Sequence, residues 1–132
     1  MAGQKIPAQD FKGKWTLVYL GGGGCDNNCE TRLYFMRQVR TAQGPERERI
    51  NRLWVVTDRT VPATPLLEQH PGLRVIRSQD PSFLAQFVGA ETGNHIYMVD
   101  PLGNLMMRFP SNPDPSLMIK DIKHLLKASQ IG

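Results

Sequence analysis

Short apolar runs alternate along this chain with segments in which apolar residues recur at helical spacing. The apolar runs have the length and the β-branched or aromatic content of strands, and they cover 15–20, 50–57, 73–76, 95–99 and 105–109. Apolar residues at three- and four-residue steps predict two longer amphipathic helices. The first is expected to start near Cys29 and to end before Gly44-Pro45, and the second to start at Asp114.

The predicted elements follow the order strand, helix, strand, short helix, strand, helix, hairpin and helix. The short helices are expected at 66–70 and after Asp80-Pro81. Alternation of strands and helices predicts an α/β sheet with crossovers, and the turn at 100–104 makes the last two strands an antiparallel hairpin. We therefore expect a three-layer α/β sandwich with a mixed central sheet and a late β-hairpin over 11–132, after a flexible arm at 1–10.

The length and composition fit one ordinary globular domain. The chain has 132 residues, of which 40% are hydrophobic and 21% charged. It contains no apolar run as long as the about 18 residues that cross a bilayer, and its start lacks the apolar core of a secretory signal. The chain as written is expected to be soluble.

The positive charge is concentrated in one region. The formal net charge is +4, and six arginines fall between Arg32 and Arg52. Glu46 and Glu48 interrupt this region, and it lacks the interleaved aromatic residues that nucleic-acid sites use. We therefore expect a solvated helix face and loop here and no nucleic-acid partner.

The candidate chemistry lies where the first strand meets the first helix. Four glycines, Gly21 to Gly24, lead into Cys25 and Cys29, which are the only two cysteines of the chain. Sites in open α/β sheets lie beyond the carboxyl ends of strands. Cys25 and Cys29 share a side if both are helical, so a reversible disulfide is expected; two thiolates also suit Cu(I).

Other uses of this turn remain open or are weaker. The cysteines could be inert buried thiols, or a disulfide that only ties the turn. Amides at the helix start favour a thiolate, whereas the carboxylates of Asp26 and Glu30 disfavour it. A structural zinc site would need a second ligand pair that is not visible, no Gly-Lys-Ser/Thr follows the glycines, and no Thr-x-x-Cys of the peroxiredoxin kind is evident.

Three histidines compete as a third metal ligand or a proton carrier. His95 begins the strand before the hairpin, and we expect it to be the one that could face the cysteine turn. His70 is expected in a surface loop before Pro71-Gly72. His124 lies on the last helix, one position off its apolar face.

Two segments resemble the Sco/SenC family of thioredoxin-fold proteins. They are 13–19 leading to Cys25-Asp26-Asn27-Asn28-Cys29, and the hairpin 96–104 with its Tyr-Met-Val-Asp-Pro-Leu-Gly sequence. The resemblance implies a thioredoxin-like domain that an upstream segment anchors to the membrane, on the periplasmic side of the bacterial inner membrane. Such proteins assist assembly of the copper centre of cytochrome c oxidase, by carrying copper or by reducing the receiving cysteines.

This sequence departs from that family at the third copper ligand. The family's histidine stands five residues before the hairpin tyrosine, a position that Thr92 occupies here, whereas His95 is only two residues before Tyr97. We therefore expect a thiol–disulfide oxidoreductase that uses Cys25 and Cys29. Its partner would be a cytochrome c oxidase subunit or another assembly factor. The alternatives are a Cu(I) metallochaperone using both cysteines with or without His95, and a non-catalytic adaptor that docks through its Arg-rich helix.

Overall fold

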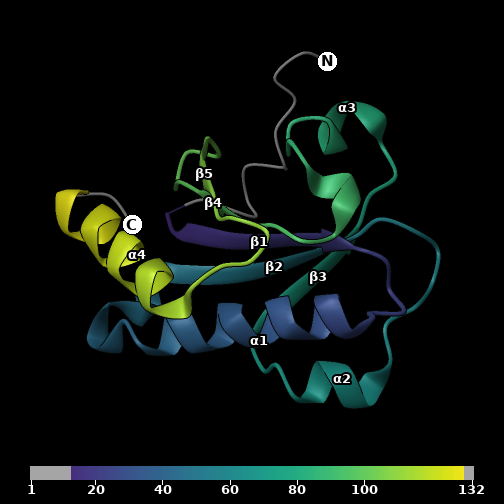
Figure 1. Cartoon of the computed structure of the whole chain (residues 1–132), viewed down its shortest axis with the longest axis horizontal. Coiled ribbons are helices and arrows are strands. Elements are labelled where there is room, and N and C mark those ends of the chain that lie inside the picture. The colour runs from purple at the N-terminus through teal and green to yellow at the C-terminus, as the bar shows by residue number, and fades with distance from the viewer. Residues whose placement is uncertain (1–12, 130–132) are drawn as a thin grey trace.

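The computed structural model describes residues 13–129, and the predicted arm at 1–10 lies outside this range. Its strands form one five-stranded sheet, shown in Figure 1, and they are β1 (Trp15–Gly21), β2 (Ile50–Val56), β3 (Leu73–Arg77), β4 (Ile96–Val99) and β5 (Leu105–Arg108). The helices are α1 (Asn27–Thr41), α2 (Thr64–Glu68), α3 (Pro81–Leu84) and α4 (Pro115–Ala128), with 3₁₀ helices η2 (Gly44–Arg49) and η3 (Ala90–Thr92).

The sheet is mixed, as the sequence predicts. Its strand order is β3-β2-β1-β4-β5. β1 and β2 run parallel, from Trp15 beside Ile50 to Gly21 beside Val56, and β2 and β3 are also parallel. β4 is antiparallel to β1 and pairs with β5 as the late hairpin. β1 is therefore flanked on both sides, which agrees with its continuous apolar sequence.

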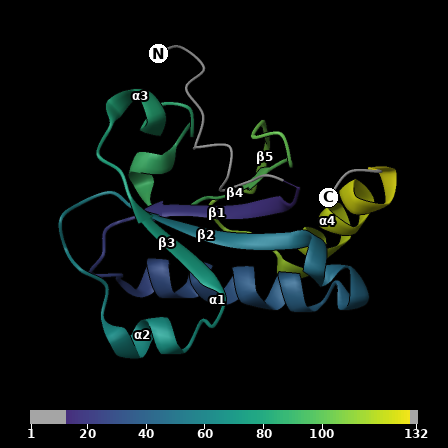
Figure 2. The same cartoon turned by 180° about the vertical axis from the view of Figure 1, so that it is seen from behind.

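Helices cover both faces of the sheet, so the three-layer expectation is confirmed. On one face, α1 and α4 pack through Met36 and Ile122 onto a core that includes Trp54. On the other face, Phe83 of α3 packs with Phe87 and strand residues in a second core. Figure 2 shows α3 and α1 on opposite sides of the sheet from behind. Within residues 13–129, no helix is both long enough and apolar enough to cross a bilayer.

The segment after α1 is more ordered than the sequence predicts. The expected loop at 46–49 is part of the 3₁₀ helix η2. Two contacts explain this difference: Arg49 pairs with Glu46 one turn earlier at 2.9 Å, and it also donates to the carbonyl of Leu126 in α4 at 2.9 Å. η2 is thereby fixed against the end of α4.

The placement of His70 on the surface was wrong. Its side chain is buried, 5% exposed, next to the equally buried Arg52. Arg52 of β2 donates to the carbonyl of Pro71, so the turn that carries His70 is held against β2 instead of projecting into water. Burial lowers the pKa of the His70 imidazole, and the positive charges of Arg37 and Arg52 lower it further.

This burial predicts a loss of stability in mild acid. The unfolded chain binds a proton at His70 near pH 6.5, whereas the folded protein binds it only at lower pH. The contribution of neutral His70 is thus complete above about pH 6.5 and is lost as pH falls through that value toward the folded pKa. Urea unfolding between pH 7.5 and 5 should show this loss, and His70→Gln should reduce it. His124→Gln, at an exposed position of α4, is the control and should leave the pH dependence unchanged.

Candidate functional site

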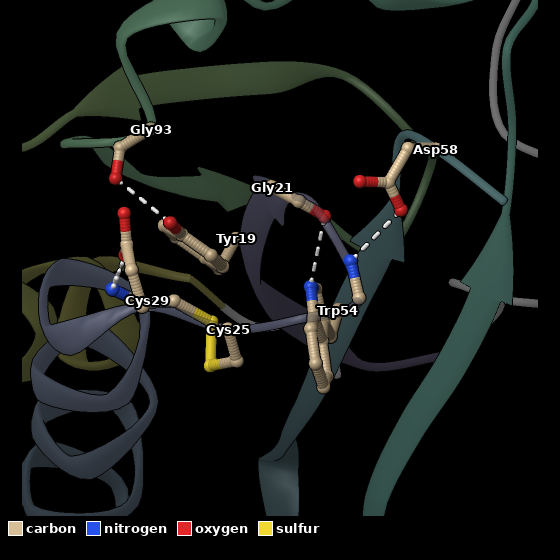
Figure 3. Close-up of a disulfide and its surroundings, with 9 residues drawn as sticks. Tyr19, Gly21, Cys25, Cys29, Trp54, Asp58 and Gly93 are labelled. Carbon is tan, nitrogen blue, oxygen red and sulfur yellow. Dashed lines mark hydrogen bonds between the residues drawn. A yellow bond between two sulfur atoms is a disulfide. The ribbon is translucent and has the colours of Figure 1, made fainter. Parts of the chain in front are cut away.

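The two cysteines are joined in a disulfide at the start of α1, shown in Figure 3. The bond links Cys25 to Cys29, whose Cα atoms are 5.0 Å apart. The sulfurs thus meet as expected, but by a different backbone route. Cys25 is not helical, because it precedes the N-cap of α1 and has a positive φ of +48°. No other non-glycine residue in the described part of the chain has a positive φ.

Hydrogen bonds fix the turn on both sides of Cys25. The Asp26 carboxylate caps α1 by accepting from the backbone N–H of Cys29 at 3.0 Å. On the other side, the N–H of Cys25 donates to the carbonyl of Gly22 at 3.2 Å. The backbone of the disulfide turn is therefore held by the chain itself as well as by the sulfur–sulfur bond.

Asp58, in the loop after β2, holds the glycine segment. One carboxylate oxygen accepts from the N–H groups of Gly23 and Thr60, each at 3.0 Å. These two hydrogen bonds hold the pKa of Asp58 below its usual range. A Cβ at Gly23 would lie 1.8 Å from the carbonyl oxygen of Thr60, so only glycine fits there. Trp54 adds a further bond from its ring N–H to the Gly21 carbonyl at 3.2 Å.

Tyr19 connects the site to the segment before β4. Its hydroxyl donates to the carbonyl of Gly93 at 2.8 Å, and Figure 3 shows the side chain pointing from β1 toward that loop. Burial and the nearby charge of Asp26 raise the pKa of Tyr19 to about 12, against an opposing effect of Arg32. The phenol therefore keeps its proton throughout the physiological pH range.

Arg32 of α1 also bonds to distant segments of the chain. The sequence placed it on a solvated helix face, and this placement was wrong. It is 8% exposed and lies one turn after Cys29. Its Nε donates to the carbonyl of Asn94 at 3.0 Å, and one terminal nitrogen donates to the carbonyl of Ser111. The charge is thus buried because carbonyl groups from two distant segments accept from it.

A cleft of about 960 Å³ opens beside the disulfide. Both cysteines line it, together with residues of the glycine segment, Thr57 and Asp58 after β2, and most of 81–93. Cys25 is 8% and Cys29 2% exposed, so Cys25 is the more exposed residue of the pair. The arrangement places a disulfide at the wall of a depression large enough for a segment of a partner.

The position that holds the third copper ligand in the Sco/SenC family is occupied here by Thr92, and it lies in this cleft. Thr92 lines it, donating its hydroxyl to the Gly89 carbonyl at 2.9 Å. His95 does not line it; its Nδ1 is 2.8 Å from the Phe109 carbonyl oxygen, which leaves Nε2 with the free lone pair. Between residues 13 and 129, no three His, Cys, Asp or Glu side chains form a group that could hold a metal. A metal role for His95 stays a prediction.

Sequence reasoning singled out the cysteines but missed three residues that shape the site. Asp58 stands two residues after the end of β2, so the rule about strand ends could have found it. Tyr19 and Arg32 give no such signal, because their partners become neighbours only through folding.

Comparison with known proteins supports the thioredoxin-like fold. Residues 15–129 match the family model described as "Transmembrane-like, thioredoxin-like, C-terminal domain". No curated protein matches the chain.

Solved structures that resemble this chain include Sco proteins. Copper-bound ScoI of Bradyrhizobium japonicum is 24% identical with a TM-score of 0.64, covering 89% of this chain and 88% of that one. Copper-bound yeast Sco1 is 20% identical with a TM-score of 0.75, covering 92% and 84%. A putative thioredoxin from Neisseria meningitidis is 16% identical with a TM-score of 0.65, covering 97% and 85%. The Sco/SenC resemblance is thus confirmed at the level of the fold.

Proposed function

We propose, from the premise that this chain belongs to the transmembrane-like, thioredoxin-like C-terminal domain family, that it is a thiol–disulfide exchange protein. Its redox pair would be Cys25 and Cys29. One observation carries the proposal: the disulfide lies at a strand-to-helix turn and lines a cleft that a partner can enter. A disulfide that only tied the turn would not need this access.

The exchange proceeds in two steps that balance two electrons. A partner thiolate attacks the sulfur of Cys25, the bond to Cys29 breaks, and its electron pair stays on the Cys29 sulfur. The first turn of α1 favours negative charge at Cys29. A second partner thiolate then attacks the partner's own sulfur in the mixed disulfide and releases the Cys25 thiolate. The partner gains a disulfide, and this protein becomes a dithiol once both thiolates take up protons; the reverse sequence reduces a partner.

A redox titration tests this proposal. The protein is equilibrated with mixtures of reduced and oxidised dithiothreitol, and free thiols are then alkylated and counted by mass spectrometry. We expect one reversible two-electron transition, with circular dichroism showing the same fold in both forms. A pair that opens only when the domain unfolds would overturn the proposal.

Copper delivery is the second candidate function. Two thiolates in one cleft match the preference of Cu(I) for soft ligands, and copper is bound in the ScoI and yeast Sco1 structures. The Thr92 hydroxyl is a poor Cu(I) ligand, so the donor set here would be both cysteines, and Nε2 of His95 would join them only if the segment 89–94 rearranged. Titration of the reduced protein with Cu(I) against a chelator tests this, with the Cys25→Ser/Cys29→Ser variant as control. Equal binding by the two proteins would exclude copper delivery through these cysteines.

We also propose a cellular context, which the Sco/SenC resemblance supports. We place the domain on the periplasmic side of the bacterial inner membrane, held by an upstream anchor, with a cytochrome c oxidase subunit or another assembly factor as its partner. The resemblance of the cysteine turn and of the hairpin supports this placement. Oxidase activity in cells that carry only the double-serine variant is the measurement: a loss is expected, and full activity would favour the non-catalytic adaptor.

A further inference from the structure

The cleft beside the disulfide carries a charge opposite to that of the whole chain. The protein has a formal net charge of +4, yet among residues 13–129 the lining of the cleft includes the carboxylates of Asp26, Asp58 and Glu91 and no Lys, Arg or His. A partner that reaches Cys25 therefore meets a negative surface on a positive protein.

The three carboxylates are not equally engaged. Asp26 and Asp58 accept hydrogen bonds from the backbone, as described above. Glu91, in η3, is exposed and forms no ion pair in the range 13–129. Three cations act on or bond to the lining without being part of it: Arg77 acts on Asp58, Arg32 acts on Tyr19, and Arg108 donates to the Val88 carbonyl at 3.0 Å.

The wall near Glu91 is apolar. Leu84, Phe87 and Val88 line it, and Val88 is 67% exposed. An apolar wall that ends at a carboxylate suits side chains with an aliphatic stem and a cationic head, which are Lys and Arg. A neutral or acidic segment would gain the apolar contact but lose the charge attraction, or meet repulsion.

We infer that the cleft selects a partner segment in which Lys or Arg residues stand next to the reacting cysteine, with Glu91 as the main specificity residue. This inference rests on the proposed exchange function. The exposed Glu91 carboxylate would steer the basic segment into the cleft and hold it on the Val88 wall while its cysteine reaches Cys25. The effect is electrostatic, so it should weaken as salt rises.

The test uses three synthetic cysteine peptides of one length, with Lys, Ser or Glu on both sides of the cysteine. The rate constant for reduction of the Cys25–Cys29 disulfide is measured for each peptide and divided by its rate with hydroxyethyl disulfide, which corrects for thiol reactivity. At low salt we expect the Lys peptide to react about tenfold faster than the Glu peptide. At about 0.5 M salt the difference should shrink because the charges are screened.

A matched pair of variants assigns the effect to the cleft. Glu91→Gln should reduce the Lys-to-Glu rate ratio, whereas Glu68→Gln, an exposed acid on α2 outside the lining, should keep it. No preference among peptides, or a ratio unchanged by Glu91→Gln, would overturn the inference while exchange with dithiothreitol still supports the proposed function. Absence of exchange with dithiothreitol as well would instead remove the proposed function itself.

Discussion

Serine at Cys29 should trap a partner on this protein, whereas serine at Cys25 should trap none. In Cys29→Ser the Cys25 thiol, which belongs to the more exposed residue of the pair, can attack a partner disulfide, but no second thiol is left to release the product. In Cys25→Ser the remaining Cys29 is only 2% exposed, so its attack is obstructed. Turnover should fall to the rate of buffer alone in both variants. The adduct is measured by mass spectrometry after incubation with a peptide disulfide.

The two variants serve as controls for each other, because each removes one sulfur atom from the same turn. Equal trapping by both variants would mean that Cys29 is as accessible as Cys25, and the order of attack proposed above would be wrong. Trapping by Cys25→Ser alone would reverse the roles of the two cysteines.

Alanine at Gly23 should destabilise the protein much more than alanine at Gly24. The new methyl group at position 23 would lie 1.8 Å from a backbone oxygen of Thr60, which cannot move away as a flexible side chain would. The loop after β2 must shift, and the bonds from Asp58 to Gly23 and Thr60 are disturbed with it. We expect Gly23→Ala to lower the free energy of unfolding by about 1–3 kcal/mol, measured by urea denaturation.

Gly24→Ala is a close control, since it adds the same methyl group one residue later. Its nearest neighbour, a methyl carbon of Thr60, would be 4.0 Å away, which is ordinary contact. We expect a change within about 0.5 kcal/mol. Similar losses in both variants would show that the glycine segment as a whole needs flexibility, and that the close approach at Gly23 is not the cause.

The sequence predicted the sheet well because its strands are short, continuous and apolar. β1 and β2 are buried on both faces, so the runs around Leu17 and Val55 have no alternation to misread. The site was found for a related reason: the glycines and the cysteine pair mark the junction of β1 with α1. The N-cap of α1 is Asp26, a residue type that commonly caps helices, and it lies between the two cysteines in the sequence. These features depend on neighbours in the chain.

The site residues that the sequence did not reveal depend on contacts between segments that are distant in the chain. Arg32 is buried because its partners Asn94 and Ser111, 62 and 79 residues away, come to lie beside it. Tyr19 bonds to Gly93 at a separation of 74 residues. Glu91 comes to line the same cleft as the disulfide only when η3 packs against β1. No local pattern carries this information, since a charged residue on a helix is more often solvated.

The spacing of the two cysteines has a consequence for the unfolded chain. The disulfide joins residues four positions apart, so it closes a very small loop. In the chain-entropy model the bond stabilises the folded state by restricting the unfolded chain, and for such a loop this stabilisation is only about 2 kcal/mol, compared with about 4.7 kcal/mol for a loop of 100 residues. The core on the α3 side of the sheet does not include the cysteines, and in the core on the α1 and α4 side they are two of 17 buried residues. Opening the disulfide therefore leaves most of the conformational stability in place, which is what the proposed thiol–disulfide exchange requires.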